Sequence, residues 1–324
     1  MTAVDTSRAD WLQARRNGIG ASDVAGILNL SPWASPFSVW ASKVDDQADD
    51  HDTPAMEFGR RAEAMIAPWF AERTGLHVAG EQAHCSRSDQ PWMMCTVDGF
   101  VVDGPNSSID DALGVLEIKT TSASAAEWAD EGLPIYYRCQ ATWAMAVTGL
   151  DRCWFAVLHL AFGRPDFQVY EFQRDPADEG FVVAEVTRFW HEHVVANVAP
   201  AVDAHQATTE AIKAHWPTAE GSLDADDAAR TLVARLNAHK ASAARLAEHI
   251  EAAENELRAL LGDREALVDG EDTKGRPIVL ASWKPQDSAR LDTKALKAAH
   301  PDLAEQFTKT TTTRVLRVTK PRSE

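Results

Sequence analysis

The feature that most constrains the fold is a pair of short apolar runs that carry acidic residues. The runs are residues 96–102 and 114–120. Side chains alternate along a strand, so Leu116 and Ile118 project to one face while Glu117 and Lys119 project to the other. Because Asp98-Gly99 signals a bend, antiparallel pairing of the two strands would bring the Asp98 carboxylate next to Glu117. The sequence therefore predicts a sheet that gathers two carboxylates and one amine.

Composition limits the class of protein. The chain has 324 residues, of which 45% are hydrophobic and 25% charged, and this is typical of a folded protein with one large domain and an appendage, or two domains. A net charge of −17 argues against a non-specific nucleic-acid coat, although an enzyme can still concentrate a few cations in a channel. No apolar run approaches the roughly 18 residues of a membrane span, and Asp5, Arg8 and Asp10 interrupt any signal peptide. We therefore expect a cytoplasmic protein.

The chain is organised in three predicted parts. Helical and strand-like patterns alternate over residues 1–205, which predicts a mixed α/β domain. Residues 206–265 contain a run of apolar or small residues at alternating steps of three and four, once His239 is allowed one of the positions. The run ends at Gly262 and predicts one long helix. This helix needs a partner, either a helix within residues 181–215 or another subunit. Residues 266–324 predict a small α+β tail, with strands at 278–283 and 314–318 around a helix at 291–299.

The predicted carboxylate pair has a chemical interpretation. Two acidic oxygens and a backbone carbonyl suit a hard divalent cation such as Mg²⁺, with water and substrate phosphate completing the octahedron. A metal held by Asp98 and Glu117 would polarise a scissile phosphate and lower the pKa of a bound water, while Lys119 would orient that water or neutralise developing charge. By itself Glu-x-Lys is a weak signal, because alternating charges on the solvent face of any strand produce it.

Asp98-Gly99 followed by Glu117-Ile118-Lys119 resembles the PD-(D/E)xK nuclease pattern, with Val97 in place of the proline. The surrounding residues resemble the branch that contains YqaJ and lambda exonuclease, a family of phage recombination exonucleases. Four further stretches carry the likeness, namely residues 11–23, 56–63, 132–149 and 292–320. The resemblance implies a restriction-endonuclease-like core, with a central mixed sheet flanked by helices, and a C-terminal helical and small β appendage.

The resemblance also implies further site residues. Glu63 would add a metal ligand from a helix, the alternative being an exposed glutamate that pairs with Arg60. The Ile118 carbonyl would complete the metal ligands. Gln140 would contribute from the helix after the catalytic strand, although Thr142 stands where the lambda enzyme has a second glutamine.

An anion site is expected near the N-terminus. The turn Gly18-Ile19-Gly20 leads into Ser22, which we expect to cap the following helix and leave free amides for a terminal phosphate. The resemblance implies that Arg15 binds a 5′-phosphate with help from Ser22, and this would impose a 5′-to-3′ direction. Arg16 could take that role instead, and the simpler alternative is an ordinary cap beside a surface charge.

The implied activity is Mg²⁺-dependent 5′-to-3′ digestion of double-stranded DNA ends, with two ions per site and Mn²⁺ as a substitute. It would release 5′-mononucleotides and leave 3′ single strands for a single-strand-annealing recombinase, in a bacterial or phage-infected cell. The family also implies a homo-oligomer, in the form of a ring-shaped trimer. Two alternatives are a structure- or site-specific endonuclease on the same core and a non-catalytic protein that binds DNA ends.

Overall fold

The computed structural model describes residues 15–45 and 53–318, and the chain divides into two units, Met1–Trp216 and Pro217–Glu324. The expected boundary at residue 205 is therefore eleven residues too early. Helix α8 (Gln206–His215) belongs to the first unit because it packs on α3 (Pro36–Val44). The hydroxyls of Thr208 and Ser35 are hydrogen-bonded there at 2.7 Å. None of the described helices is long and apolar enough to cross a membrane.

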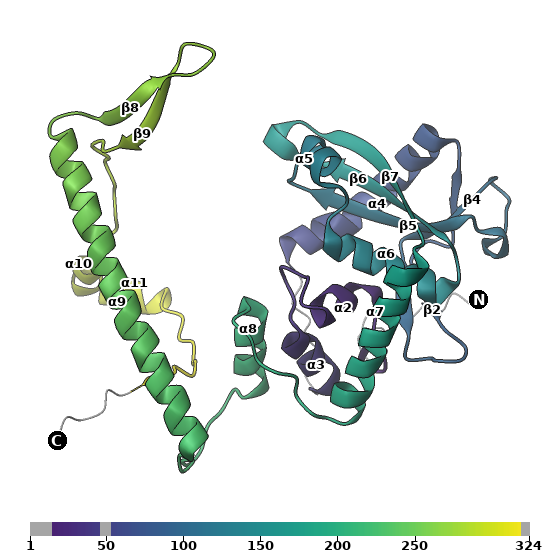
Figure 1. Cartoon of the computed structure of the whole chain (residues 1–324), viewed down its shortest axis with the longest axis horizontal. Helices are drawn as coiled ribbons and strands as arrows, with labels where there is room; N and C mark the ends of the chain where they lie inside the picture. The colour runs from purple at the N-terminus through teal and green to yellow at the C-terminus, as the bar shows by residue number, and fades with distance from the viewer. Residues whose placement is uncertain (1–14, 46–52, 319–324) are drawn as a thin grey trace. The chain divides into compact units, whose positions relative to one another are not determined.

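The first unit is built on a five-stranded mixed sheet with the order β1-β4-β5-β6-β7 (Figure 1). Strands β5 and β6 run parallel, and every other neighbouring pair is antiparallel. A separate antiparallel hairpin is formed by β2 and β3. The strands are β1 (His77–Ala79), β2 (Ala83–Ser86), β3 (Met94–Val97), β4 (Gly99–Val102), β5 (Gly114–Thr121), β6 (Arg152–His159) and β7 (Asp166–Gln173).

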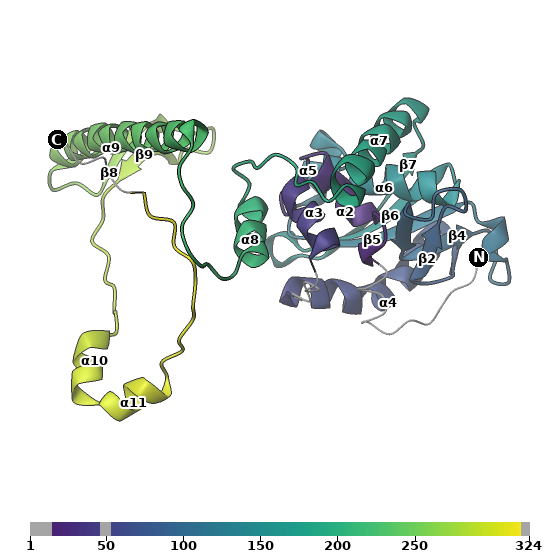
Figure 2. The same cartoon turned by 90° about the horizontal axis from the view of Figure 1, so that it is seen from below.

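Helices cover both faces of this sheet (Figure 2), which confirms the predicted fold class. Helix α4 packs on one face of β5 and β6, and α6 packs on the other together with α2 and α7. Besides α3 and α8, this unit contains the α-helices α2 (Ala21–Ile27), α4 (Pro54–Thr74), α5 (Ala125–Glu131), α6 (Ile135–Thr148) and α7 (Pro176–Phe189). The short helices are η1 (Ile109–Asp111), η2 (Ala161–Gly163) and the π-helical η3 (Trp190–Val195).

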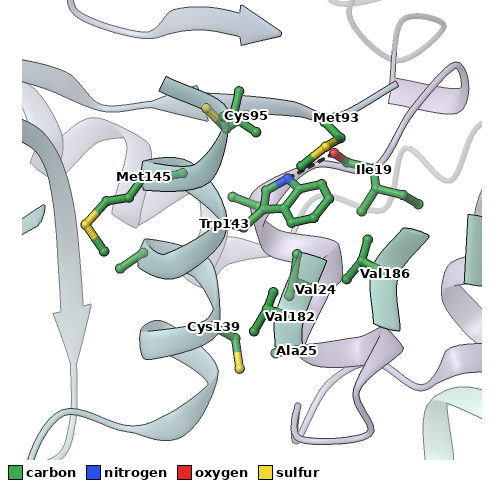
Figure 3. Packing of buried hydrophobic residues seen from close by; sticks show 14 of the residues in the cluster. Ile19, Val24, Ala25, Met93, Cys95, Cys139, Trp143, Met145, Val182 and Val186 are labelled. Atoms are coloured by element: carbon green, nitrogen blue, oxygen red, sulfur yellow. Dashed lines mark hydrogen bonds between the residues drawn. The ribbon is translucent and has the colours of Figure 1, made fainter. Parts of the chain in front are cut away.

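The alternation predicted for β5 separates two apolar clusters. Leu116 and Ile118 pack with Ile66 and Phe70 of α4. On the opposite face, Trp143 of α6 is completely buried against α2 and α7 (Figure 3). Its indole N–H donates to the carbonyl oxygens of Met94 (2.9 Å) and Ile19 (3.3 Å). The chain just before α2 is thereby held against α6.

The second unit contains the predicted long helix, α9 (Asp227–Leu261), followed by β8 (Ala266–Glu271), β9 (Pro277–Ser282), α10 (Thr293–Ala299) and α11 (Pro301–Gln306). Asp226 caps α9 by accepting a hydrogen bond from the Ala229 amide (2.7 Å), and Gly262 ends it with a φ of 58°. The strand at 278–283 and the helix at 291–299 are confirmed within about two residues. The strand expected at 314–318 was wrong, because β9 pairs with β8 across a tight turn and those residues form no described strand.

Candidate active site

Antiparallel pairing of β4 and β5 brings Asp98 to Glu117, as the sequence predicts. Gly99 stands opposite Leu116 in the ladder. Asp98 Oδ2 accepts a hydrogen bond from the Ile118 amide at 2.6 Å, which ties the carboxylate to the backbone of β5. The bend after Asp98 thus fixes one carboxylate beside the strand that carries the other.

Glu117 is the most buried charged residue of this group, with 1% of its surface exposed. Its Oε2 accepts hydrogen bonds from Lys119 Nζ (2.7 Å) and Gln140 Nε2 (2.6 Å). Its Oε1 is buried and has no hydrogen-bond partner among the described residues. Burial raises the pKa of Glu117 to about 7; Lys119 opposes the rise and Asp98 adds to it. Gln140, expected only from the resemblance, therefore does contact Glu117 of β5.

Lys119 is held as a cation within this group. Its side chain is 17% exposed, and Nζ lies 5.6 Å from the centre of the Tyr137 ring. Burial alone would lower the pKa of Lys119, but Glu117 and Asp98 together raise it above its ordinary value. The amine is therefore charged at every pH at which the carboxylates ionise.

Glu63 of α4 is linked to Asp98 by the side chain of Gln82, a residue that no sequence motif predicted. Gln82 Nε2 donates to Glu63 Oε2 (2.7 Å) and to Asp98 Oδ1 (3.3 Å). The Gln82 backbone has a φ of 53°, in the left-handed region, and its amide donates to the Asp98 carbonyl (3.3 Å). Burial, followed by the charge of Asp98, raises the pKa of Glu63 to about 7. No local motif marks Gln82, because only the pairing of the strands on either side of Asp98 puts it there.

The residues of this group fit a divalent cation. A buried carboxylate oxygen without a partner, Glu117 Oε1, is the kind of donor that a cation satisfies. Among the described residues, no three His, Cys, Asp or Glu side chains converge as ligands of a single ion. Mg²⁺ does not require three, because it binds through one or two carboxylates and takes its other ligands from water and substrate phosphate.

The N-terminal residues form a second polar cluster around Asp23. Arg15 donates to Asp23 Oδ1 (3.2 Å) and makes a long contact with the Ser22 hydroxyl (3.5 Å). Asp23 Oδ2 accepts from the buried Lys43 Nζ (2.6 Å) and from the Gly20 amide (2.9 Å). Although burial opposes it, the charges of Lys43 and Arg15 lower the pKa of Asp23. The contact with Ser22 is made by Arg15, whereas Arg16 is half-buried next to it.

Ser22 does not cap α2, contrary to expectation. The N-cap is Gly20, and Asp23 accepts the Gly20 amide from the first turn while Ser22 stays exposed. Asp23 and Lys43 carried no signal in the sequence analysis, because Lys43 lies twenty residues further along the chain, on α3.

Sequence comparisons show the family of the chain. Residues 10–151 match the YqaJ-like viral recombinase domain. Over 313 residues the chain is 30% identical to the uncharacterized protein YqaJ of Bacillus subtilis (strain 168), and the alignment covers 95% of this chain and 92% of that one. The chain belongs to the YqaJ family. This confirms the family that the motifs predicted.

Three solved structures are similar to part of this YqaJ-family protein. The alkaline exonuclease LHK-Exo from Laribacter hongkongensis has a TM-score of 0.46 at 22% identity, and the same exonuclease in complex with dAMP has a TM-score of 0.47 at 22% identity. Each alignment covers 59% of this chain and 94% of the other. A phage related exonuclease from Haemophilus somnus has a TM-score of 0.39 at 10% identity, over 61% of this chain and 96% of its own.

Proposed function

We propose that the protein is a Mg²⁺-dependent 5′-to-3′ exonuclease that digests double-stranded DNA ends, releases 5′-mononucleotides and leaves 3′ single strands for phage-type recombination. The observation that carries this proposal is Glu117. It is buried between Asp98 and Lys119, with one oxygen bound by Lys119 and Gln140 and the other without a partner among the described residues. Membership of a viral recombinase family supports the same reading.

The residues have separate roles in this proposal. Asp98, Glu117 and the Ile118 carbonyl would hold the cation, and Glu63 with Asp98 would serve a second ion; Mn²⁺ would substitute. A bound ion supplies Lewis-acid polarisation of the phosphate and lowers the pKa of a bound water. Lys119, kept charged by its two carboxylate neighbours, neutralises charge that develops on the phosphoryl oxygens.

Gln140 is a positioning residue. Its amide donates to the same Glu117 oxygen as Lys119 does, so Oε2 is saturated by the protein and Oε1 is the atom available to a cation. An amide serves this purpose because it adds a hydrogen bond without adding charge.

Arg15 would set the direction of digestion by binding a terminal 5′-phosphate through its planar fork, with the Ser22 hydroxyl assisting. The support is that Arg15 is anchored by Asp23 and remains 40% exposed at its side chain. Trp143 ties the chain before α2 to α6, one helical turn from Gln140. The phosphate site and the cation site would thus flank a single helix.

A ring-shaped trimer around the duplex and a single-strand-annealing partner protein are also part of the proposal, and both rest on the family. A ring would let the acidic chain, with a net charge of −17, surround a lumen lined by a part of its 32 Lys and Arg residues.

The decisive experiment is digestion of linear duplex labelled separately at each end, with and without Mg²⁺. We expect label at the 5′ end to be released first as mononucleotide, no loss of closed circular duplex, and at least a hundredfold slower cleavage for Asp98→Ala, Glu117→Ala and Lys119→Ala. Nicking of the circle would favour an endonuclease on the same core. Substantial activity in all three variants would refute the site.

The end pocket has its own test. Arg15→Ala should remove the preference for a 5′-phosphate over a 5′-hydroxyl end, and Arg16→Ala is the matched control that should retain it. Equal digestion of 5′-phosphate and 5′-hydroxyl ends by the unmodified protein would refute the phosphate pocket at Arg15. The proposed cation site would not be affected by that result.

A further inference from the structure

The long helix α9 carries a seam of apolar residues, interrupted once by His239, and most of its large side chains are exposed. Seam positions recur in steps of four and three from Leu232 to Leu260, which is the heptad pattern of a coiled coil. The exposed fraction is 56% for Leu232, 60% for Leu246, 51% for Ile250 and 68% for Leu260. The full seam is Leu232, Leu236, His239, Ala243, Leu246, Ile250, Ala253, Leu257 and Leu260.

No described element of the second unit packs along this seam. The hairpin of β8 and β9 follows the helix, and α10 and α11 are joined to it by extended chain (Figure 2). The helix has 35 residues, which corresponds to a length of about 50 Å. An apolar stripe that covers four heptads on a long helix is typical of a helix that pairs with another helix.

The charges that flank the seam discriminate between the two ways in which two such helices could pair. In a parallel pair, the residue directly before Leu236 faces the residue five positions further along the partner helix. Arg235 would therefore meet the partner's Lys240. These like charges would repel on both sides of the pair. In an antiparallel pair with Leu246 facing the partner's Ile250, Lys240 lies opposite the partner's Glu254.

The antiparallel register is therefore self-complementary. It creates the Lys240–Glu254 contact twice, and it keeps large apolar residues in contact at the centre of the pair. Within one helix Glu254 accepts a hydrogen bond from Arg258 at 2.5 Å. This is an exposed pair one turn apart, which leaves the carboxylate accessible to a second cation.

We propose that α9 is an assembly element, which pairs antiparallel with α9 of a second copy of this chain, with Leu246 opposite the partner's Ile250. The pairing links two copies through the second unit. It is independent of the proposed cleavage activity and of any assembly that the first unit forms.

The first test measures the mass of the full-length protein by analytical ultracentrifugation. Ala253 and Ala252 are neighbours on the exposed helix, but only Ala253 belongs to the seam. Ala253→Glu should lower the weight-average mass up to twofold, to half when the pair separates fully, whereas Ala252→Glu should leave it unchanged, with equal helix content by circular dichroism. Equal masses for the unmodified chain and both variants would overturn the proposal, including the case in which another part of the chain or a different protein covers the seam.

The second test determines orientation by disulfide formation. The four natural cysteines are buried, so an introduced exposed pair reports on the seam. In the proposed register Ala243 faces the partner's Ala253, so mixing Ala243→Cys with Ala253→Cys protein should give a cross-linked dimer, and neither variant alone should. Cross-linking of each variant with itself would indicate a parallel pair, and no cross-link in the mixture would indicate no such pair; either result overturns the proposal.

Discussion

Replacing Glu117 by glutamine should stabilise the metal-free protein at pH 8 while it slows cleavage by orders of magnitude. The buried Glu117 carboxyl has a pKa of about 7 against an ordinary value of 4.5. It therefore binds its proton more tightly in the folded than in the unfolded chain, and the free energy of unfolding falls as pH rises from about 4.5 until the loss is complete above about 7. At about 1.4 kcal/mol for each pH unit, ionisation costs the fold about 3 kcal/mol. Glutamine resembles the protonated carboxyl and escapes this cost.

The assay is urea unfolding of both proteins in EDTA between pH 5 and 9, followed by tryptophan fluorescence. All of the eleven tryptophans except Trp283 lie in the first unit, so the signal reports the unit that contains the site. The two stabilities should coincide near pH 5 and diverge to about 3 kcal/mol at pH 8. Glu72→Gln, an exposed change on α4, is the matched control and should show no such divergence. A Glu117→Gln variant that is equally or less stable at pH 8 would refute the reasoning.

Three further predictions concern stability and metal binding. Lys43→Met leaves Asp23 buried without its principal cation and should lower the free energy of unfolding by about 3–5 kcal/mol, with partial recovery in the double variant with Asp23→Asn; no loss in urea unfolding would contradict it. Gln82→Ala releases Glu63 and should weaken Mn²⁺ binding about 10- to 100-fold by calorimetry, whereas an unchanged affinity would show that Gln82 does not position Glu63. Because Glu63 and Glu117 both have a pKa of about 7, Mn²⁺ affinity measured by electron paramagnetic resonance should rise with pH up to about 7 and then level off, and a flat profile would be inconsistent with ligation by them.

Strand β5 could be predicted because its alternating pattern is local. The alternation in β5 is a property of extended backbone, so the faces of Leu116 and Glu117 follow from the order of residues alone. Asp98 is displaced from Glu117 by nineteen positions, but a bend signal and an antiparallel hairpin connection are enough to join them. Helix α9 could be predicted for the same reason, because its seam and the glycine that ends it, Gly262, lie within one continuous stretch of the chain.

The errors and omissions arise where two patterns compete or where contacts are long-range. The strand expected at 314–318 is a short run with three apolar residues of five, yet residues 266–271 lie closer in sequence to β9 and close the hairpin with a short turn. Ser22 looked like a cap, yet Gly20 caps α2 because Asp23 can bind the Gly20 amide and the buried Lys43 at once. Each outcome depends on a contact that a local sequence pattern does not predict: the pairing of β8 with β9, and the contact of Lys43 with Asp23.

By itself the sequence determined the family, the layered α/β fold, the grouping of Asp98, Glu117 and Lys119, and the long helix, because short-range periodicity and motif spacing encode them. Only the tertiary structure decided how those charges are set: which Glu117 oxygen is already bound, how Gln82 links Glu63 to Asp98, and how Lys43 holds Asp23 beneath Arg15. Burial and proximity of residues far apart in the chain govern hydrogen bonding and pKa, and both come into existence only when the sheet and its helices are assembled.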